Sequence, residues 1–248
     1  MTHTSRVTRR QAHQPISPRT RNLVITIDGP AGVGKSTAAK LLARRLGLVY
    51  LDTGATYRAL AYLVLQEQPV ALSNPVKLAV MARALPLRLE PARDGGLRVF
   101  LDGFEITRAI RTQEVSEAAA QVSTFPEVRA AMVARQRELS KGRGVVVEGR
   151  DTGSVVFPDA PVKFYLTADL GVRAQRRQRE LFKLYGEPTP LAQIREEIHF
   201  RDLLDQSRPV GRLVKPKGAL AVDTTRLSVE QVVARMLRHI RARRPSAP

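Results

Sequence analysis

Cysteine and tryptophan are absent from this chain of 248 residues, and histidine occurs only four times. Without cysteine there is no disulfide scaffold, no thiolate nucleophile, no cysteine-ligated zinc and no iron–sulfur cluster. The four histidines are scattered along the sequence, so they indicate neither a metal cluster nor a Ser/His/Asp hydrolase. We interpret them as solvent-exposed side chains.

Long apolar runs are also missing. No run approaches the roughly 18 to 20 residues of a membrane-spanning helix, and residues 1–22 lack the apolar stretch of a secretory signal. We therefore expect a soluble, cytoplasmic protein that does not contact a membrane. An organelle transit peptide is a minor alternative, since this acid-free start is rich in Arg, Ser and Thr, although Pro15 and Pro18 would interrupt an amphipathic helix.

Acidic side chains are the minority, with 41 Lys and Arg against 23 Asp and Glu, for a formal net charge of +18. Five arginines lie in residues 1–22, and the C-terminal end is equally free of acid. We predict disordered basic tails at 1–22 and 241–248, and we expect any contact with nucleic acid to be confined to them. The body between them is moderately basic, which suits anionic substrates.

Short β-branched apolar runs alternate with helix-forming stretches from residue 23 onward. The runs expected to be strands are LVITID at 23–28, VYLD at 49–52, GVVVEG at 144–149 and VKFYLTA at 162–168. Helices are expected at 37–46, 55–68 and 114–141, the last broken near Pro126, and from about 169. This alternation predicts an α/β fold with a doubly wound parallel sheet.

The rhythm changes between residues 69 and 113. LPLRLE and LRVFLDG flank a turn-like segment at 93–96, which predicts an antiparallel hairpin. We interpret residues 69–113 as a subdomain inserted into a single domain that spans 23–240.

GPAGVGKS follows the first predicted strand and opens a helix, which is the context that a phosphate-binding loop requires. Its glycines let backbone N–H groups converge on phosphate oxygens, Lys35 reaches the terminal phosphates, and Ser36 is a ligand for Mg²⁺. The predicted donor site consists of Gly29, Pro30, Ala31, Gly32, Val33, Gly34, Lys35, Ser36 and Thr37. The loop by itself does not separate kinases from other NTPases.

Several arginines follow predicted strand ends or loops, where ligands bind in open α/β sheets. They are Arg58, Arg129 and Arg150, the last followed by Asp151. In the segment 194–208, helical periodicity places Arg201, Asp205 and Arg208 on the face of Ile194 and Ile198, flanked by Phe200 and Leu204. Charges that continue an apolar stripe are expected where a helix leaves the core and lines a cleft.

Arg173, Arg176 and Arg177 share one helix face after the VKFYLTA strand. Three neighbouring cations repel one another unless an anion lies nearby, so we predict an Arg-rich helical lid over the donor phosphates at about 169–190. A simply solvated helix is the alternative.

Taken together, the motifs resemble those of bacterial cytidylate kinases. The similar segments are ITIDGPAGVGKST, LDTGATYRALA, IRTQEVSEAAAQVSTFPEVR, VVVEGRDTGSVVFPDAPVKFYL, RAQRR and RDLLDQSR, and the similarity covers about residues 23–240. Members of that family phosphorylate CMP and dCMP with ATP, so the resemblance implies a P-loop NTPase core, an NMP-binding insert and a lid.

The resemblance also implies roles for individual residues. Thr53, Arg58 and Arg150 match positions that hold the acceptor phosphate, Arg129 and Asp151 match those that read cytosine, and Arg201, Asp205 and Arg208 match those that hold the ribose and the neighbouring phosphate. The predicted catalytic residues are Lys35, Arg150 and Arg208. Thr53 stands where Ser is usual, and Ala120 stands where many members place a hydroxyl near the base.

Phosphoryl transfer to a monophosphate needs no general base, because the acceptor is already largely dianionic at pH 7. The predicted enzyme is therefore an ATP- and Mg²⁺-dependent kinase acting as a monomer on CMP or dCMP. Two other hypotheses stay open. One is another small-molecule P-loop kinase, with Asp151 as base toward an alcohol such as shikimate or a sugar acid. The other is an NTP-binding module acting on nucleic acid through the basic tails, against which the 5% aromatic content argues.

Overall fold

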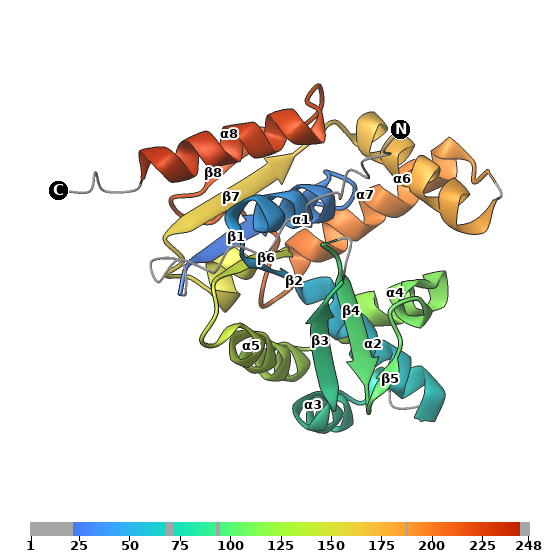
Figure 1. Cartoon of the computed structure of the whole chain (residues 1–248). Coiled ribbons are helices and arrows are strands. Elements are labelled where there is room, and N and C mark those ends of the chain that lie inside the picture. The colour runs from blue at the N-terminus through green and yellow to red at the C-terminus, as the bar shows by residue number, and fades with distance from the viewer. Residues whose placement is uncertain (1–21, 68–71, 93–94, 187, 244–248) are drawn as a thin grey trace, which may run out of the picture.

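The computed structural model describes residues 22–67, 72–92, 95–186 and 188–243. A five-stranded sheet in the order β2-β6-β1-β7-β8 forms the larger part, and a three-stranded sheet in the order β3-β4-β5 lies in the lower part of Figure 1. The strands of the larger sheet are β1 Val24–Asp28, β2 Val49–Asp52, β6 Val145–Gly149, β7 Val162–Thr167 and β8 Leu220–Asp223. All of its pairings are parallel, which confirms the predicted parallel sheet.

The central position of β1 explains its composition. It pairs with β6 on one side and β7 on the other, and Ile25 and Ile27 are fully buried. A strand enclosed on both faces requires a continuous apolar run, which the sequence supplies. Its last residue, Asp28, is in register with Gly149, so the carboxyl ends of β1 and β6 meet at one edge of the sheet.

Local signals in the sequence set most helix ends. The helices outside the insert are α1 Lys35–Leu46, α2 Thr53–Glu67, α4 Gln113–Val122, α5 Pro126–Ser140, α6 Leu170–Tyr185, α7 Leu191–Ser207 and α8 Val229–Ala242. Gly34 and Gly47, both in the left-handed region, flank α1. Thr112 caps α4 with its side chain, and α5 begins at Pro126, so the predicted break between these helices is confirmed.

The predicted insert contains α3 Pro75–Ala84, β3 Leu87–Pro91, β4 Leu97–Leu101, β5 Phe104–Glu105 and the short 3₁₀ turn η3 Ala109–Arg111. β3 and β4 form the expected antiparallel hairpin, while β5 was not anticipated. Part of the predicted turn, residues 93–94, lies outside the described residues. The small sheet is not isolated, because its strand β4 contacts α2 and β2, and α3 of the insert packs on α5.

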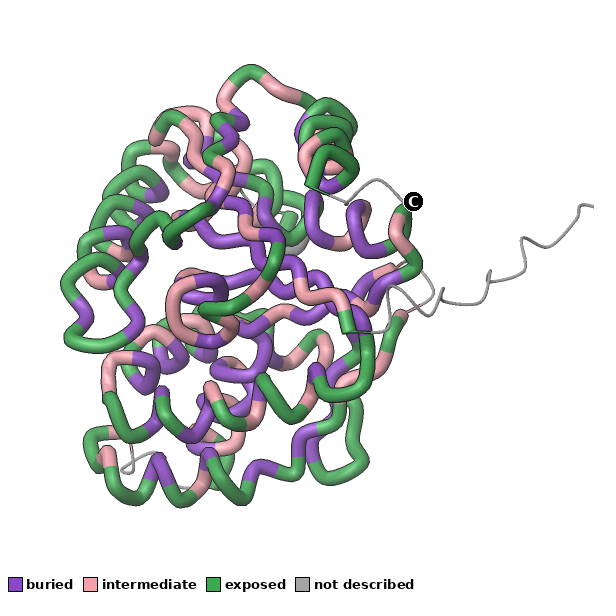
Figure 2. Tube along the Cα trace, turned by 90° about the vertical axis from the view of Figure 1, so that its left-hand side faces the viewer, coloured by how far each residue is buried: buried purple, intermediate pink, exposed green. Residues whose placement is uncertain are grey.

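Buried residues concentrate along the strands and the inward faces of the helices in Figure 2. Within the described part of the chain no helix is long and apolar enough to span a membrane. His199 is exposed as expected, but His239 is half-buried with its ring edge against Phe164. Residues 1–21 and 244–248, most of the two predicted tails, lie outside the described residues.

Candidate functional site

The glycine loop connects β1 to α1 and forms one wall of a cavity of about 470 Å³. Lining residues from the predicted donor site are Gly32, Val33, Gly34, Lys35, Ser36, Thr37, Arg176 and Arg177, joined by Ala38, Glu180, Thr224, Leu227, Val229 and Val232. Gly29, Pro30 and Ala31 begin the loop and do not line the cavity. The Lys35 ammonium donates to the Pro30 carbonyl oxygen at 2.7 Å, which folds the lysine back along the loop.

The three arginines of the predicted lid lie on α6, and each of them already contacts a protein oxygen. Arg173 pairs with Asp202 at 2.5 Å, Arg176 donates to the Thr224 carbonyl at 2.7 Å, and Arg177 pairs with Glu180 at 3.0 Å. The three cations therefore have protein partners without an external anion, and the lid over the donor phosphates stays a prediction. Arg173 is buried and lies outside the cavity lining, while Arg176 and Arg177 border it.

Glu148 was missed in the sequence, although it nearly ends the VVVE run. It is buried on β6, accepts a hydrogen bond from the Tyr50 hydroxyl at 2.6 Å and is hydrogen-bonded to Ser36. Burial and the neighbouring Asp52 raise the pKa of Glu148. Burial and Arg150 lower the pKa of Lys35 to about 7, while Glu148 acts in the opposite direction. The cations Lys35 and Arg150 and the carboxyl group of Glu148 therefore lie close together beside the donor loop.

A second group of predicted residues lies across the strand ends from the donor loop. Arg129, which is 2% exposed, forms an ion pair with Asp151 and donates to the Ser123 carbonyl oxygen at 3.1 Å. The Thr53 hydroxyl donates to the Glu148 carbonyl oxygen at 2.7 Å. The structure thus brings the predicted base-reading pair and the predicted phosphate-binding threonine to the same edge of the sheet.

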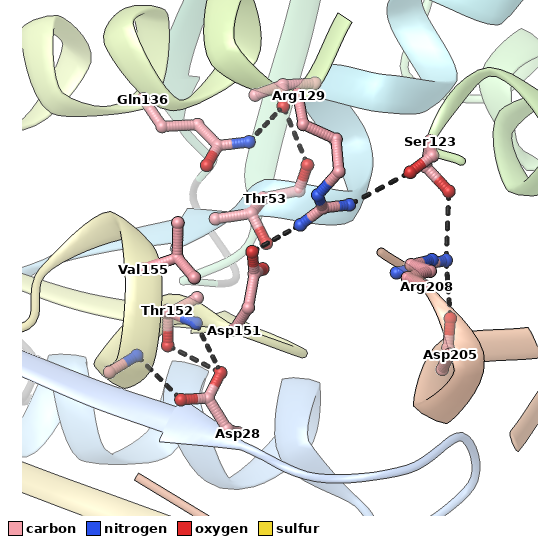
Figure 3. Close-up of polar contacts among 12 residues, drawn as sticks. Asp28, Thr53, Ser123, Arg129, Gln136, Asp151, Thr152, Val155, Asp205 and Arg208 are labelled. Carbon is pink, nitrogen blue, oxygen red and sulfur yellow. Dashed lines mark hydrogen bonds and ion pairs between the residues drawn. The ribbon is translucent and has the colours of Figure 1, made fainter. Parts of the chain in front are cut away.

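Asp205 joins this group to α7. It accepts from Arg150 at 2.7 Å. It also accepts from Arg208 at 2.5 Å, and Arg208 donates to the Ser123 hydroxyl at 2.9 Å (Figure 3). Burial alone would raise the pKa of Asp205, but the two guanidinium groups lower it below its ordinary value. Ser123 was not among the predicted site residues, because nothing in its local sequence shows that two arginines converge on it.

Two further arginines lie near Arg150. Arg58 pairs with Asp52 at 2.7 Å. Burial and the charge of Arg150 lower the pKa of Arg201 to about 10, although Asp205 acts in the opposite direction. The predicted flanking residue Phe200 is 63% exposed and does not continue the buried stripe of α7. Asp202 lies one helix turn before Asp205 and is also buried, and it forms an ion pair with Arg173.

Comparisons with known proteins identify the family to which this chain is similar. A family model described as cytidylate kinase matches residues 25–242. The cytidylate kinase of Caldanaerobacter subterraneus subsp. tengcongensis is 46% identical over 217 residues, which cover 88% of this chain and 94% of that protein. The cytidylate kinases of Geobacillus sp. (strain WCH70) and Shewanella loihica are 45% and 42% identical, each over 90% of this chain and 98% and 96% of their own lengths.

Proposed function

This chain belongs to the cytidylate kinase family, and we propose that it transfers the γ-phosphoryl group of ATP to CMP or dCMP through the residues described above. The observation that carries the proposed site is a group of cations between the glycine loop and the Arg129–Asp151 pair. Burial and repulsion by Arg150 lower the pKa values of both Lys35 and Arg201. Phosphate groups placed among them would relieve that repulsion.

The roles follow from position. ATP phosphates would lie along the glycine loop, with Lys35 beside the transferring phosphoryl group and Arg150 between donor and acceptor. The acceptor phosphate would lie near Thr53, Arg58 and Arg201. Charge neutralisation and alignment of the two phosphates are then the main contributions of the protein to catalysis.

Asp151 and Arg129 supply the means to read the base. The Asp151 carboxylate can accept from the exocyclic amino group of cytosine and would repel the carbonyl oxygen at that position in uracil. Because Asp151 is engaged by Arg129, it is not a free general base, which disfavours the alternative of an alcohol acceptor.

The donor loop also fits a magnesium ion. Ser36 presents an exposed hydroxyl directly after Lys35, and the Glu148 carboxylate beside it supplies negative charge. We propose that Ser36 is the ligand for Mg²⁺ and that Glu148 supports it. The ion would neutralise phosphate charge during transfer.

A panel of acceptors tests this function. With ATP and Mg²⁺, we expect ADP formation with CMP and dCMP at rates at least tenfold above those with UMP, shikimate or gluconate, because among these acceptors only CMP and dCMP offer both an amino group to Asp151 and a phosphate to the arginines. Product analysis by chromatography should show CDP or dCDP. Faster turnover of shikimate or gluconate than of CMP would contradict the proposal and favour the alcohol-acceptor alternative.

The hydroxyl at position 123 offers a second test. Ser123→Ala removes the group to which Arg208 donates, while the backbone carbonyl that holds Arg129 remains. Loss of one hydrogen bond to a charged group should lower kcat/KM for CMP by roughly tenfold.

Ala120→Ser adds a hydroxyl one helix turn before Ser123. It should raise the CMP-over-UMP ratio of kcat/KM by about fivefold, the value of one neutral hydrogen bond. Steady-state kinetics of both variants measure these effects, and unchanged constants would show that neither hydroxyl position affects substrate.

A further inference from the structure

Asp28 is a buried carboxylate that the proposed mechanism does not use. It is the last residue of β1, it is 0% exposed, and Gly29 of the donor loop follows it. One of its oxygens accepts from the backbone N–H and the hydroxyl of Thr152, at 2.7 and 2.8 Å, and the other accepts from the backbone N–H of Gly153 at 2.7 Å. Figure 3 shows Asp28 directed toward this turn.

The segment that Asp28 holds has an unusual backbone. Residues Thr152–Val156 form the single π-helical turn η4, in which the N–H of Phe157 reaches the carbonyl of Thr152 at 2.7 Å. The first N–H groups of a helical turn have no partner within it, and the Asp28 carboxylate satisfies two of them from another strand. Isolated π turns are frequent at functional sites. The residue that holds this turn in place is therefore a candidate for a functional role.

The turn lies tightly against β1. A Cβ atom at Gly153 would lie 2.6 Å from the Thr26 hydroxyl and 3.0 Å from Pro216, so only glycine permits this approach. β1 itself is fixed on both sides by β6 and β7. Asp28 therefore transmits the position of a rigid strand to the turn.

Asp151 immediately precedes that turn. Its carboxylate pairs with Arg129, whereas Asp28 lies close enough to repel it electrostatically. Attraction by Arg129 on one side and repulsion by Asp28 on the other both direct the Asp151 carboxylate away from β1. Thr152, adjacent to Asp151 in the chain, is fixed at the same time through its N–H and its hydroxyl.

We propose that Asp28 is a positioning residue for base recognition: by holding the start of η4, it sets the orientation in which Asp151 and Arg129 read cytosine. This inference rests on the proposed function. It links the strand that ends at the donor loop to the loop that faces the acceptor, so one buried carboxylate sets the relative placement of the two substrates.

Asp28→Asn is the test variant. Asparagine has one oxygen and one N–H₂ group where aspartate has two oxygens. If the oxygen accepts from Thr152, the N–H₂ group faces the Gly153 N–H, and if it accepts from Gly153, the N–H₂ group faces Thr152. In either orientation at least one buried donor loses its acceptor. We expect KM for CMP to rise about tenfold and the CMP-over-UMP ratio of kcat/KM to fall about tenfold. KM for ATP should change less, within about threefold, because the β1 backbone fixes the start of the donor loop and Asp28 is a weak influence among the charges that act on Lys35.

Two companion variants separate positioning from general stability. Thr152→Val removes only the hydroxyl contact and should change the same two constants in the same direction by about threefold. Thr26→Ser keeps the hydroxyl that lies against Gly153 and removes only a methyl group, so it should leave all constants within about twofold of wild type. Calorimetric titration of CMP in the absence of ATP should show the same order of affinities, with wild type and Thr26→Ser tightest and Asp28→Asn weakest.

The outcomes are distinguishable. If wild-type protein does not phosphorylate CMP, the proposed function fails and this inference fails with it. If wild type is active but the CMP-over-UMP ratio is unchanged in Asp28→Asn and Thr152→Val, only the inference is overturned, and a parallel loss of thermal stability would assign Asp28 a structural role. Should Asp28→Asn not fold, Thr152→Val decides by the same ratio.

Discussion

Replacing Lys35 with alanine is expected to lower kcat by about three orders of magnitude while the protein stays folded. The Lys35 ammonium is the cation nearest the proposed path of the phosphoryl group, and in P-loop enzymes this lysine neutralises charge that develops during transfer. Removal of a group that acts mainly on the transition state lowers kcat more than it raises KM. Burial and Arg150 lower the pKa of Lys35 to about 7, so its loss also removes an unfavourable buried charge from the free protein.

Kinetics and thermal melting of Lys35→Ala should therefore diverge, with activity lost and Tm unchanged or slightly higher. Lys40→Ala is the matched control, because Lys40 lies on the same helix with its ammonium over the Tyr50 ring and outside the donor loop. Its kcat should stay within about twofold of wild type. Near-normal turnover of Lys35→Ala would show that GPAGVGKS does not bind the donor phosphates.

The strands of the large sheet were predictable where both faces are covered. β1 and β6 carry mainly apolar, buried runs because neighbouring strands and helices enclose them, while β7 alternates buried and half-buried residues. β8 was not anticipated, since its apolar run is only three residues long and only Val222 of its residues is buried. The third strand of the insert, β5, has two residues, both exposed, and follows from its pairing with β4 alone.

The site was predictable as far as motifs reach. The glycine loop, Arg129, Asp151 and Arg150 follow recognisable patterns, and the structure places them at one edge of the sheet. Asp28 and Glu148 were missed as site residues, because their importance comes from burial and from partners far along the chain. Asp28, for example, meets Thr152 across 124 residues.

Helical periodicity correctly predicted that the Arg208 side chain lies on the side of Asp205, but it wrongly placed Arg208 within the helix. α7 ends at Ser207, and Arg208 follows it in an extended conformation with φ −53° and ψ 139°. The side chain still returns to Asp205, because the residue after a helix end can reach the last turn. Periodicity predicted the shared face correctly for Asp205, which is buried, and incorrectly for Phe200, which is exposed.

Loss of the Arg208 side chain is expected to have the second largest effect on catalysis. Arg208 pairs with Asp205 and donates to the Ser123 hydroxyl. The Arg129 guanidinium donates to the backbone carbonyl of the same serine. An arginine facing substrate phosphate or ribose in a closed site contributes roughly 2 to 5 kcal/mol, against about 0 to 1 kcal/mol for an exposed ion pair. Arg208→Ala should therefore lower kcat/KM for CMP by at least thirtyfold at saturating ATP.

Two variants show whether this loss is chemical or structural. Arg208→Lys keeps the charge but not the planar fork that contacts two partners, so it should recover only part of the activity. Arg195→Ala on the exposed side of the same helix should stay within twofold of wild type. Asp205 keeps Arg150 as a partner in Arg208→Ala, so its charge is not left unpaired and the fold should survive. If kcat/KM decreases by less than threefold in Arg208→Ala, this arginine lies outside the substrate site. Its contacts with Asp205 and Ser123 would then only stabilise the end of α7.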